Sequence, residues 1–268
     1  MDQGAGVAGL SSCPQERRRT ARALSALAGG PVASAADREL AAVIEARFPG
    51  TGAQVREARE FHSLAAERAV REQGARGLLV VPVGYPCDPD PHARALAADP
   101  AARCALADPD EEAALIAGAK WGGERVSVLR SLASDAAGLM GSEAASGLPA
   151  PLCLLLPHVA SMLPPEVAAG MLAAYAKLLP PGSIVILSWW APGGGPGGDA
   201  VLALWRELVA PAWGHTGADV AGWLDAAGLE TLRSPRDVRV RPGRAWLEAE
   251  YARRPPGRMM RAIARVRD

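Results

Sequence analysis

The spacing of apolar residues changes about a quarter of the way along the chain. In the first part, apolar side chains recur at intervals of three and four, which predicts three helices. They cover residues 16–28, 34–48 and 52–74. Ser34 is suited to cap the second helix, and Gly74 is suited to end the third. The sequence therefore predicts a helical cap over residues 16–74, preceded by a flexible tail over residues 1–15 that is rich in glycine and serine.

From residue 75 onward, short apolar runs alternate with helical segments. These runs predict five strands, over residues 77–83, 102–107, 124–130, 150–157 and 182–190. Strands separated by helices are typical of a parallel sheet that is covered by helices on both faces. Two later strand-like runs, 229–233 and 243–254, suit an antiparallel hairpin that closes the sheet.

The pattern as a whole predicts an α/β fold with a Rossmann-like, doubly wound, seven-stranded sheet. This domain is expected over residues 75–253. Residues 254–268 are rich in arginine and are interpreted as a basic C-terminal tail, with apolar positions that suit an amphipathic helix.

Composition narrows the classes of partner. The chain has 268 residues, of which 49% are hydrophobic and 22% charged, and its formal net charge is zero. Such a composition is ordinary for a globular protein and gives no electrostatic attraction to nucleic acid. No apolar run reaches the roughly 18 residues that a membrane helix needs, so we expect no membrane partner.

The cysteines and histidines give no sign of a metal site. None of the four cysteines forms a CxxC pair, and no two of the four histidines have the spacing of metal ligands. Free thiols and the lack of a secretory apolar stretch at the start of the sequence favour a cytoplasmic protein.

The segment "GLLVVPVGYPCDPDPH" (77–92) lies where many nucleotide-binding folds carry a glycine-rich loop. Here the loop has one glycine, Gly84, among several prolines. The residues alone are compatible with an altered cofactor loop or with a buried strand and a turn, since a lone glycine has little specificity.

Four segments resemble one protein family. They are "ARALSALAGGPVASAADRE" (21–39), "REFHSLAAERAVREQG" (59–74), "LLLPHVASMLPP" (154–165) and "PPGSIVILS" (180–188). Together they resemble an actinobacterial family of S-adenosylmethionine-dependent methyltransferases, formerly a domain of unknown function, over about residues 20–235. The resemblance implies the class I methyltransferase fold and S-adenosylmethionine as cofactor.

The resemblance also implies a set of cofactor-binding residues. The positions that match the family are Gly29, Gly30, Gly84, Asp108 and Arg130. Four other positions, at which the family carries an acid or a glycine, are Val80, Pro82, Leu106 and Val128. We interpret these replacements as a cofactor site that has become apolar. A buried polar group without a partner costs about 1–3 kcal/mol, so this interpretation predicts weak cofactor binding or none.

Four residues are candidates for the substrate side of the site. His158 follows the fourth strand and is either a general base or a strand-end histidine bonded to the backbone. Trp189 and Trp190 end the fifth strand, where their side chains point to opposite faces, so at most one enters a given pocket. His215 is either part of a substrate lid or a turn residue.

Three hypotheses for the function follow. In the first, the protein is a pseudoenzyme, a non-methylating or weakly cofactor-binding descendant of a methyltransferase that binds an apolar small molecule or a partner. In the second, it is an active methyltransferase that acts on a small molecule. In the third, it is a structural or interaction protein that forms a homo-oligomer or stabilises a protein partner.

Overall fold

The computed structural model describes residues 14–193, 199–237 and 258–267. The strands are β1 (Gly77–Val80), β2 (Arg103–Asp108), β3 (Val126–Arg130), β4 (Leu152–Leu156), β5 (Ile184–Ala191), β6 (Leu229–Asp237) and β7 (Arg258–Val266). The helices are α1 (Pro14–Ala28), α2 (Ala35–Arg47), α3 (Thr51–Gln73), α4 (Ala93–Ala98), α5 (Glu111–Trp121), α6 (Ala136–Gly141), α7 (Glu143–Ser146), α8 (Pro165–Leu178), α9 (Ala200–Leu208) and α10 (Gly217–Ala226), with a short 3₁₀ helix η1 (Val159–Met162).

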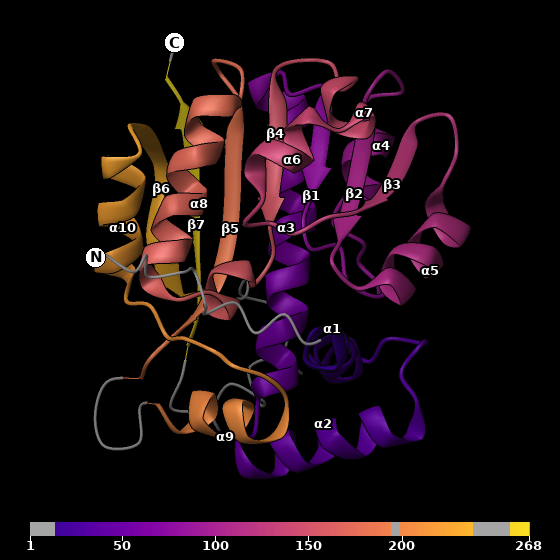
Figure 1. The fold of residues 1–268 in the computed structure, drawn as a ribbon, viewed down its shortest axis with the longest axis vertical. Coiled ribbons are helices and arrows are strands. Elements are labelled where there is room, and N and C mark those ends of the chain that lie inside the picture. Colours follow the sequence, from indigo (N-terminus) through magenta and orange to yellow (C-terminus); the bar gives the residue numbers. More distant parts are fainter. Residues whose placement is uncertain (1–13, 194–198, 238–257, 268) are drawn as a thin grey trace, which may run out of the picture.

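The strands form one seven-stranded sheet in the order β3-β2-β1-β4-β5-β7-β6 (Figure 1). Strands β1 to β5 are parallel, and β7 is antiparallel to both of its neighbours. The order reverses between β1 and β4, and ligands of such sheets bind beyond the carboxyl ends of the strands at this point. The predicted doubly wound α/β fold is confirmed.

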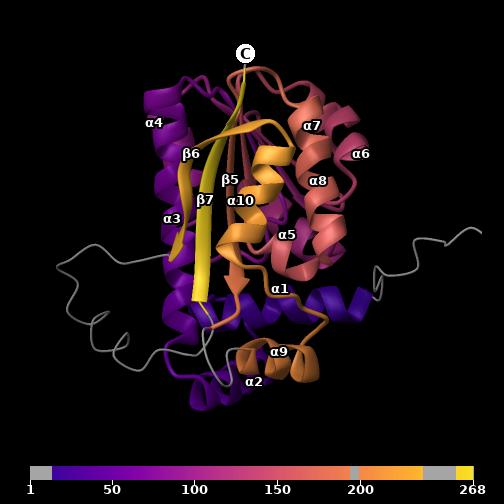
Figure 2. The same cartoon turned by 90° about the vertical axis from the view of Figure 1, so that its left-hand side faces the viewer.

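Helices cover both faces of the sheet. Figure 2 shows α3 and α4 on one side, and α6, α7, α8 and α10 on the other. Alternate residues of β1 and the residue that follows it contact the two helical layers. Leu78 and Val80 pack toward α3, whereas Leu79 and Val81 pack toward α8. The central strands are therefore buried on both faces, which explains their nearly continuous apolar sequence.

Of the three helices expected to form a cap, α1 and α2 lie at the edge of the sheet, whereas α3 packs along one face of it (Figures 1 and 2). The side chain and backbone of Ser34 exchange hydrogen bonds with Asp37, which caps α2, and Gly74 ends α3 with a left-handed φ of 73°. Helices α1, α2 and α9 lie below the carboxyl ends of the strands in Figure 1. The cap therefore covers the edge of the sheet at which a ligand is expected.

The C-terminal residues correct one prediction. Residues 258–266 are not part of a basic tail or an amphipathic helix, but form β7 between β5 and β6. Ala262 and Ala264 pack toward α8 and α10, whereas Arg261 stacks on Phe61 of α3 and Arg265 bonds to Gln73. The arginines Arg258, Arg261 and Arg265 made the strand look like a solvated basic segment.

Other differences are smaller. β1 ends at Val80 rather than at residue 83, and α6 and α7 were not predicted. Two predicted segments lie largely or wholly outside the described residues: the N-terminal tail and the strand over residues 243–254. In the structure the neighbour of β6 is β7, whereas we expected residues 243–254 to pair with it.

Candidate ligand-binding site

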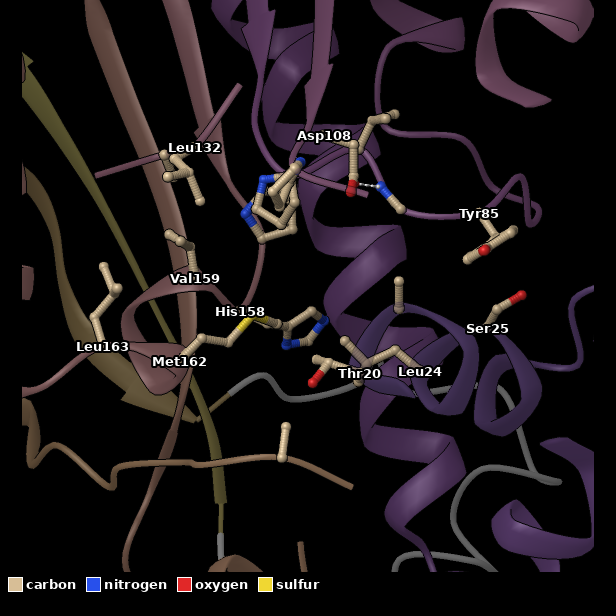
Figure 3. Close-up of a pocket in the computed structure, with 18 of the residues that line it drawn as sticks. Thr20, Leu24, Ser25, Tyr85, Asp108, Leu132, His158, Val159, Met162 and Leu163 are labelled. Carbon is tan, nitrogen blue, oxygen red and sulfur yellow. Dashed lines mark hydrogen bonds between the residues drawn. The ribbon is translucent and has the colours of Figure 1, made fainter. Parts of the chain in front are cut away.

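A cavity of about 240 Å³ lies at the carboxyl ends of β1, β2 and β4, below the point where the strand order reverses. We call it the carboxyl-edge cavity; Leu24, Pro82, Asp108, Leu132, His158 and Trp213 are among the residues that line it. Helix α1 closes it from the cap side, and η1 closes it from the side of β4 and β5 (Figure 3). Its volume is slightly below the roughly 300–1,000 Å³ of most ligand pockets, which favours a compact ligand.

The wall near β1 and β2 is held together by Asp108. Its two carboxylate oxygens accept hydrogen bonds from the backbone N–H groups of Gly84, at 2.8 Å, and Asp110, at 2.9 Å. Burial raises the pKa of Asp108 to about 7, although the two N–H donors oppose this shift. Gly84 has a φ of 67°, which a residue with a side chain rarely adopts, so this glycine permits the turn.

The lining divides into two parts. In Figure 3, the apolar side chains of Leu132, Val159, Met162 and Leu163 lie on one side of the cavity. On the other side lie Leu24 and the polar side chains of Thr20, Ser25, Tyr85 and Asp108, and the ring of His158 stands between the two groups. The cavity therefore suits a ligand that has an apolar body and a small polar part.

His158 has an unusual backbone and an unpaired ring nitrogen. Its φ is 57°, and its backbone N–H donates to Ser188 Oγ at 3.3 Å. The hydroxyl of Ser188 also lies 2.9 Å from Nε2 of His62, so β5 and α3 together fix the position of His158. The His158 side chain is buried, and its Nδ1 atom has no hydrogen-bond partner among the described residues.

Burial, with the nearby charge of Arg59, lowers the pKa of His158 to about 3. The ring is therefore neutral at pH 7 and offers one donor and one acceptor. A base with so low a pKa is a weak proton acceptor, so the structure favours hydrogen bonding over proton abstraction by this histidine.

The charged side chains near the cavity are already paired. Arg59 of α3 lines the cavity, donates from Nε to the carbonyl oxygen of Cys87 at 3.1 Å, and lies 3.4 Å from Asp90. Arg22 of α1 forms ion pairs with Asp37 and Glu112 and stacks over Tyr85. Arg22 thereby fastens the cap to the loop that follows β1.

The structure brings together only some of the predicted cofactor residues. Gly84, Asp108 and Pro82 line the cavity. Gly29 ends α1 and Gly30 packs against Ser25, so both act in the turn of the cap. Arg130 is exposed, 3.7 Å from Glu111, and does not line the cavity.

Three of the four replaced positions also lie elsewhere. Val80 and Leu106 are fully buried within the sheet, on the face that packs toward α3, and Val128 lies beside Gly118 of α5. These three side chains therefore do not line the carboxyl-edge cavity. The cavity is largely apolar, but its apolar wall comes from Pro82 and from residues that the sequence did not single out.

The predicted substrate residues other than His158 have structural roles. Trp189 donates from Nε1 to the carbonyl oxygen of His215 at 2.8 Å, and His215 donates from Nε2 to Ala160 at 2.9 Å. Trp190 packs in the core on the α3 side of the sheet. Neither tryptophan nor His215 lines the carboxyl-edge cavity, whereas Trp213 does.

Sequence reasoning also missed Leu24, Ser25 and Met162 as lining residues. The only signal for them was their place in segments that match the family, because nothing in a sequence shows that α1 folds across the sheet edge. Arg59 belonged to a matching segment but was not predicted to line the site.

The described residues hold neither a candidate metal site nor a candidate membrane-spanning helix. Across the described ranges, no group of three or more histidine, cysteine, aspartate or glutamate side chains is placed to hold a metal ion. Within the same part of the chain, no helix has the length and hydropathy needed to cross a membrane.

Comparisons with known proteins bear on the family and the fold of this chain. The family described as S-adenosyl methyltransferase matches residues 10–235. A comparison with curated proteins finds no significant match.

Two solved structures are similar along nearly the whole chain. A candidate methyltransferase from Thermobifida fusca has 20% identity and a TM-score of 0.82, with 99% of this chain and 100% of the other covered. A DUF574-family protein from Streptomyces avermitilis has 21% identity and a TM-score of 0.81, with 94% and 98% covered. At these identities the likeness shows the fold, which both structures share with this chain.

Proposed function

Because the chain belongs to the S-adenosyl methyltransferase family, we propose that its carboxyl-edge cavity retains the family's binding position but takes a compact, largely apolar molecule. In this proposal S-adenosylmethionine binds weakly, and the protein does not use it for methyl transfer. The proposal rests on the side chains that line the cavity and on the partners they already have.

The residues present fit S-adenosylmethionine poorly. That cofactor carries two ribose hydroxyls, an adenine amine, an ammonium group and a carboxylate, each of which needs a partner when buried. Among the described residues that line the cavity, Asp108 is the one carboxylate and Arg59 the one guanidinium. Asp108 already accepts two backbone N–H groups, and Arg59 is bound to Cys87 and Asp90.

Unpaired groups make this mismatch costly. Each buried neutral group without a partner loses about 1–3 kcal/mol, and a charged group loses more. A loss of about 1.4 kcal/mol weakens binding tenfold, so three such groups would raise the dissociation constant by roughly two to six powers of ten. A ligand with few polar groups avoids this loss.

The observation that carries the proposal is the wall formed by Leu132, Val159, Met162 and Leu163, which lie together on one side of the cavity (Figure 3). Apolar side chains around a concave site favour an apolar ligand, because the ligand and the wall are both removed from water.

Methyl transfer to a small molecule is the second candidate function. One observation favours it: the cavity lies where the strand order reverses, next to the left-handed turn at Gly84. The low basicity of His158 argues against a reaction in which this residue removes a proton from the substrate.

Calorimetric titration of the full-length protein with S-adenosylmethionine and S-adenosylhomocysteine tests the proposal. We expect dissociation constants of about 1 mM or weaker for both compounds, since the cavity leaves several of their polar groups unpaired. A dissociation constant in the micromolar range for either compound would refute the proposal in favour of the second candidate.

A further inference from the structure

The unpaired polar atoms near the cavity indicate which atom of His158 a ligand can meet. His158 Nδ1 and Ser25 Oγ are both buried, and neither has a hydrogen-bond partner among the described residues. His158 lines the carboxyl-edge cavity, whereas the hydroxyl of Ser25 faces Gly30 in the turn of the cap. A ligand that covers Nε2, the other ring nitrogen of His158, without bonding to it would lose about 1–3 kcal/mol.

His158 is placed to meet a ligand. Its ring projects from the loop before η1 toward α1, next to Met162 and Leu24 (Figure 3). Its exposed fraction is 5%, and the backbone bond to Ser188, which is itself bonded to His62, limits its movement. A fixed ring loses little conformational entropy when it forms a hydrogen bond.

The charges around the cavity favour a neutral polar group on the ligand. Arg59 already forms an ion pair with Asp90 and donates a hydrogen bond to the carbonyl oxygen of Cys87. The carboxyl group of Asp108 lies on the polar side of the cavity and would repel an anion whenever it is ionised. The imidazole of His158 is uncharged at neutral pH and needs no counter-ion.

We infer that the ligand is a neutral, mainly apolar molecule with one hydroxyl group that hydrogen-bonds to Nε2 of His158, because Nδ1 is enclosed by the protein. Its apolar body packs against Leu132, Val159, Met162 and Leu163. His158 is thus the residue that determines specificity, and Ser188 and His62 are positioning residues. This inference rests on the proposed function, because it requires that the cavity binds an apolar molecule.

The test uses three probes of similar size: 2-naphthol, 2-methylnaphthalene and 2-naphthoate. The first has a hydroxyl group, the second replaces it by a methyl group, and the third carries an anion. Dissociation constants for the full-length protein are measured by calorimetry. The variant is His158→Asn, since asparagine tolerates a positive φ. The matched control is His92→Asn, because His92 is also a buried histidine with an unpaired Nδ1 but does not line the cavity.

We expect the ratio of the 2-naphthol affinity to the 2-methylnaphthalene affinity to fall about fivefold to tenfold in His158→Asn, as the loss of one hydrogen bond of about 1 kcal/mol implies. In His92→Asn the ratio should equal that of the wild type. An unchanged ratio in His158→Asn would overturn the role of His158, and tighter binding of 2-naphthoate than of 2-naphthol to the wild type would overturn the neutral ligand. If no probe binds, the proposed function itself fails.

A second measurement applies if His158→Asn does not fold. The ring nitrogens of ¹⁵N-histidine-labelled wild-type protein are observed by NMR during titration with 2-naphthol. We expect one histidine to shift strongly and the remaining three to shift little. Equal, small shifts of all four histidines despite probe binding would contradict a hydrogen bond to His158.

Discussion

Replacement of Ala262 by aspartate should lower the melting temperature by about 10 °C or more, or prevent folding. Ala262 is fully buried in β7, opposite Leu187 of β5. A charge without a partner at such a place costs about 3–5 kcal/mol, and each kcal/mol shifts the melting temperature of a chain of this size by roughly 2–4 °C. Thermal unfolding followed by circular dichroism measures the change.

Arg265→Gln is the matched control, because it lies on the same strand. Its side chain is 37% exposed, bonds to Gln73, and lies 3.9 Å from Glu230. Exposed ion pairs contribute about 0–1 kcal/mol, so this variant should melt within a few degrees of the wild type. A wild-type melting temperature for Ala262→Asp would show that residues 258–266 are not an internal strand.

Acidification from pH 7.5 to pH 4.5 should destabilise the protein by at least about 2 kcal/mol. Burial lowers the pKa of His158 to about 3 and that of His92 to about 4, and it lowers the pKa of His62 well below its ordinary value. An unfolded histidine binds its proton near pH 6.5. The stability from these neutral rings is therefore complete above pH 6.5 and is lost as the pH falls toward the folded pKa values.

Asp108 acts in the opposite direction. Its folded pKa of about 7 exceeds the unfolded value of about 3.9, so its ionisation penalises the fold above this range and the penalty disappears as the pH falls. Between pH 7.5 and pH 4.5, protonation of Asp108 adds about 3 kcal/mol to the free energy of unfolding. Over the same range His158 and His92 each lower the free energy of unfolding by about 2–3 kcal/mol, and His62 lowers it further.

Urea unfolding at the two pH values, followed by tryptophan fluorescence, measures this balance. In His92→Asn the free energy of unfolding should change between pH 7.5 and pH 4.5 by about 2 kcal/mol less than in the wild type. The reason is that the unfolded variant has one fewer histidine to bind a proton. Equal free energies of unfolding at both pH values in the wild type would contradict the neutral, buried state of the three histidines.

The sequence predicts the parallel part of the fold well, because the signals there are local. Runs such as 152–156 and 184–191 are nearly all apolar, as expected for strands that are buried on both faces. Ser34 and Gly74 mark helix ends by their own chemistry. The β7 strand escaped prediction because Arg261 and Arg265 interact with α3, and contacts between distant segments leave no local pattern.

The candidate site could be predicted in position but not in detail. Gly84, Asp108 and His158 lie at or just after the ends of β1, β2 and β4, and the topology brings these ends together. Trp189 and His215 seemed equally well placed, yet the two residues bond to each other and pack outside the cavity. The helices that cover the carboxyl edge determine which side chains at a strand end face the cavity. In this protein those helices are α1 and η1.

The account depends most on one property of the carboxyl-edge cavity, namely its preference for an apolar molecule over a nucleoside. The most direct test is a competition in which S-adenosylhomocysteine is added to the protein with 2-naphthol bound, and the fluorescence anisotropy of the probe is recorded. We expect the probe to remain bound until the competitor reaches about 1 mM. Complete displacement at about 10 μM would show that the cavity holds the nucleoside tightly, and would contradict the account.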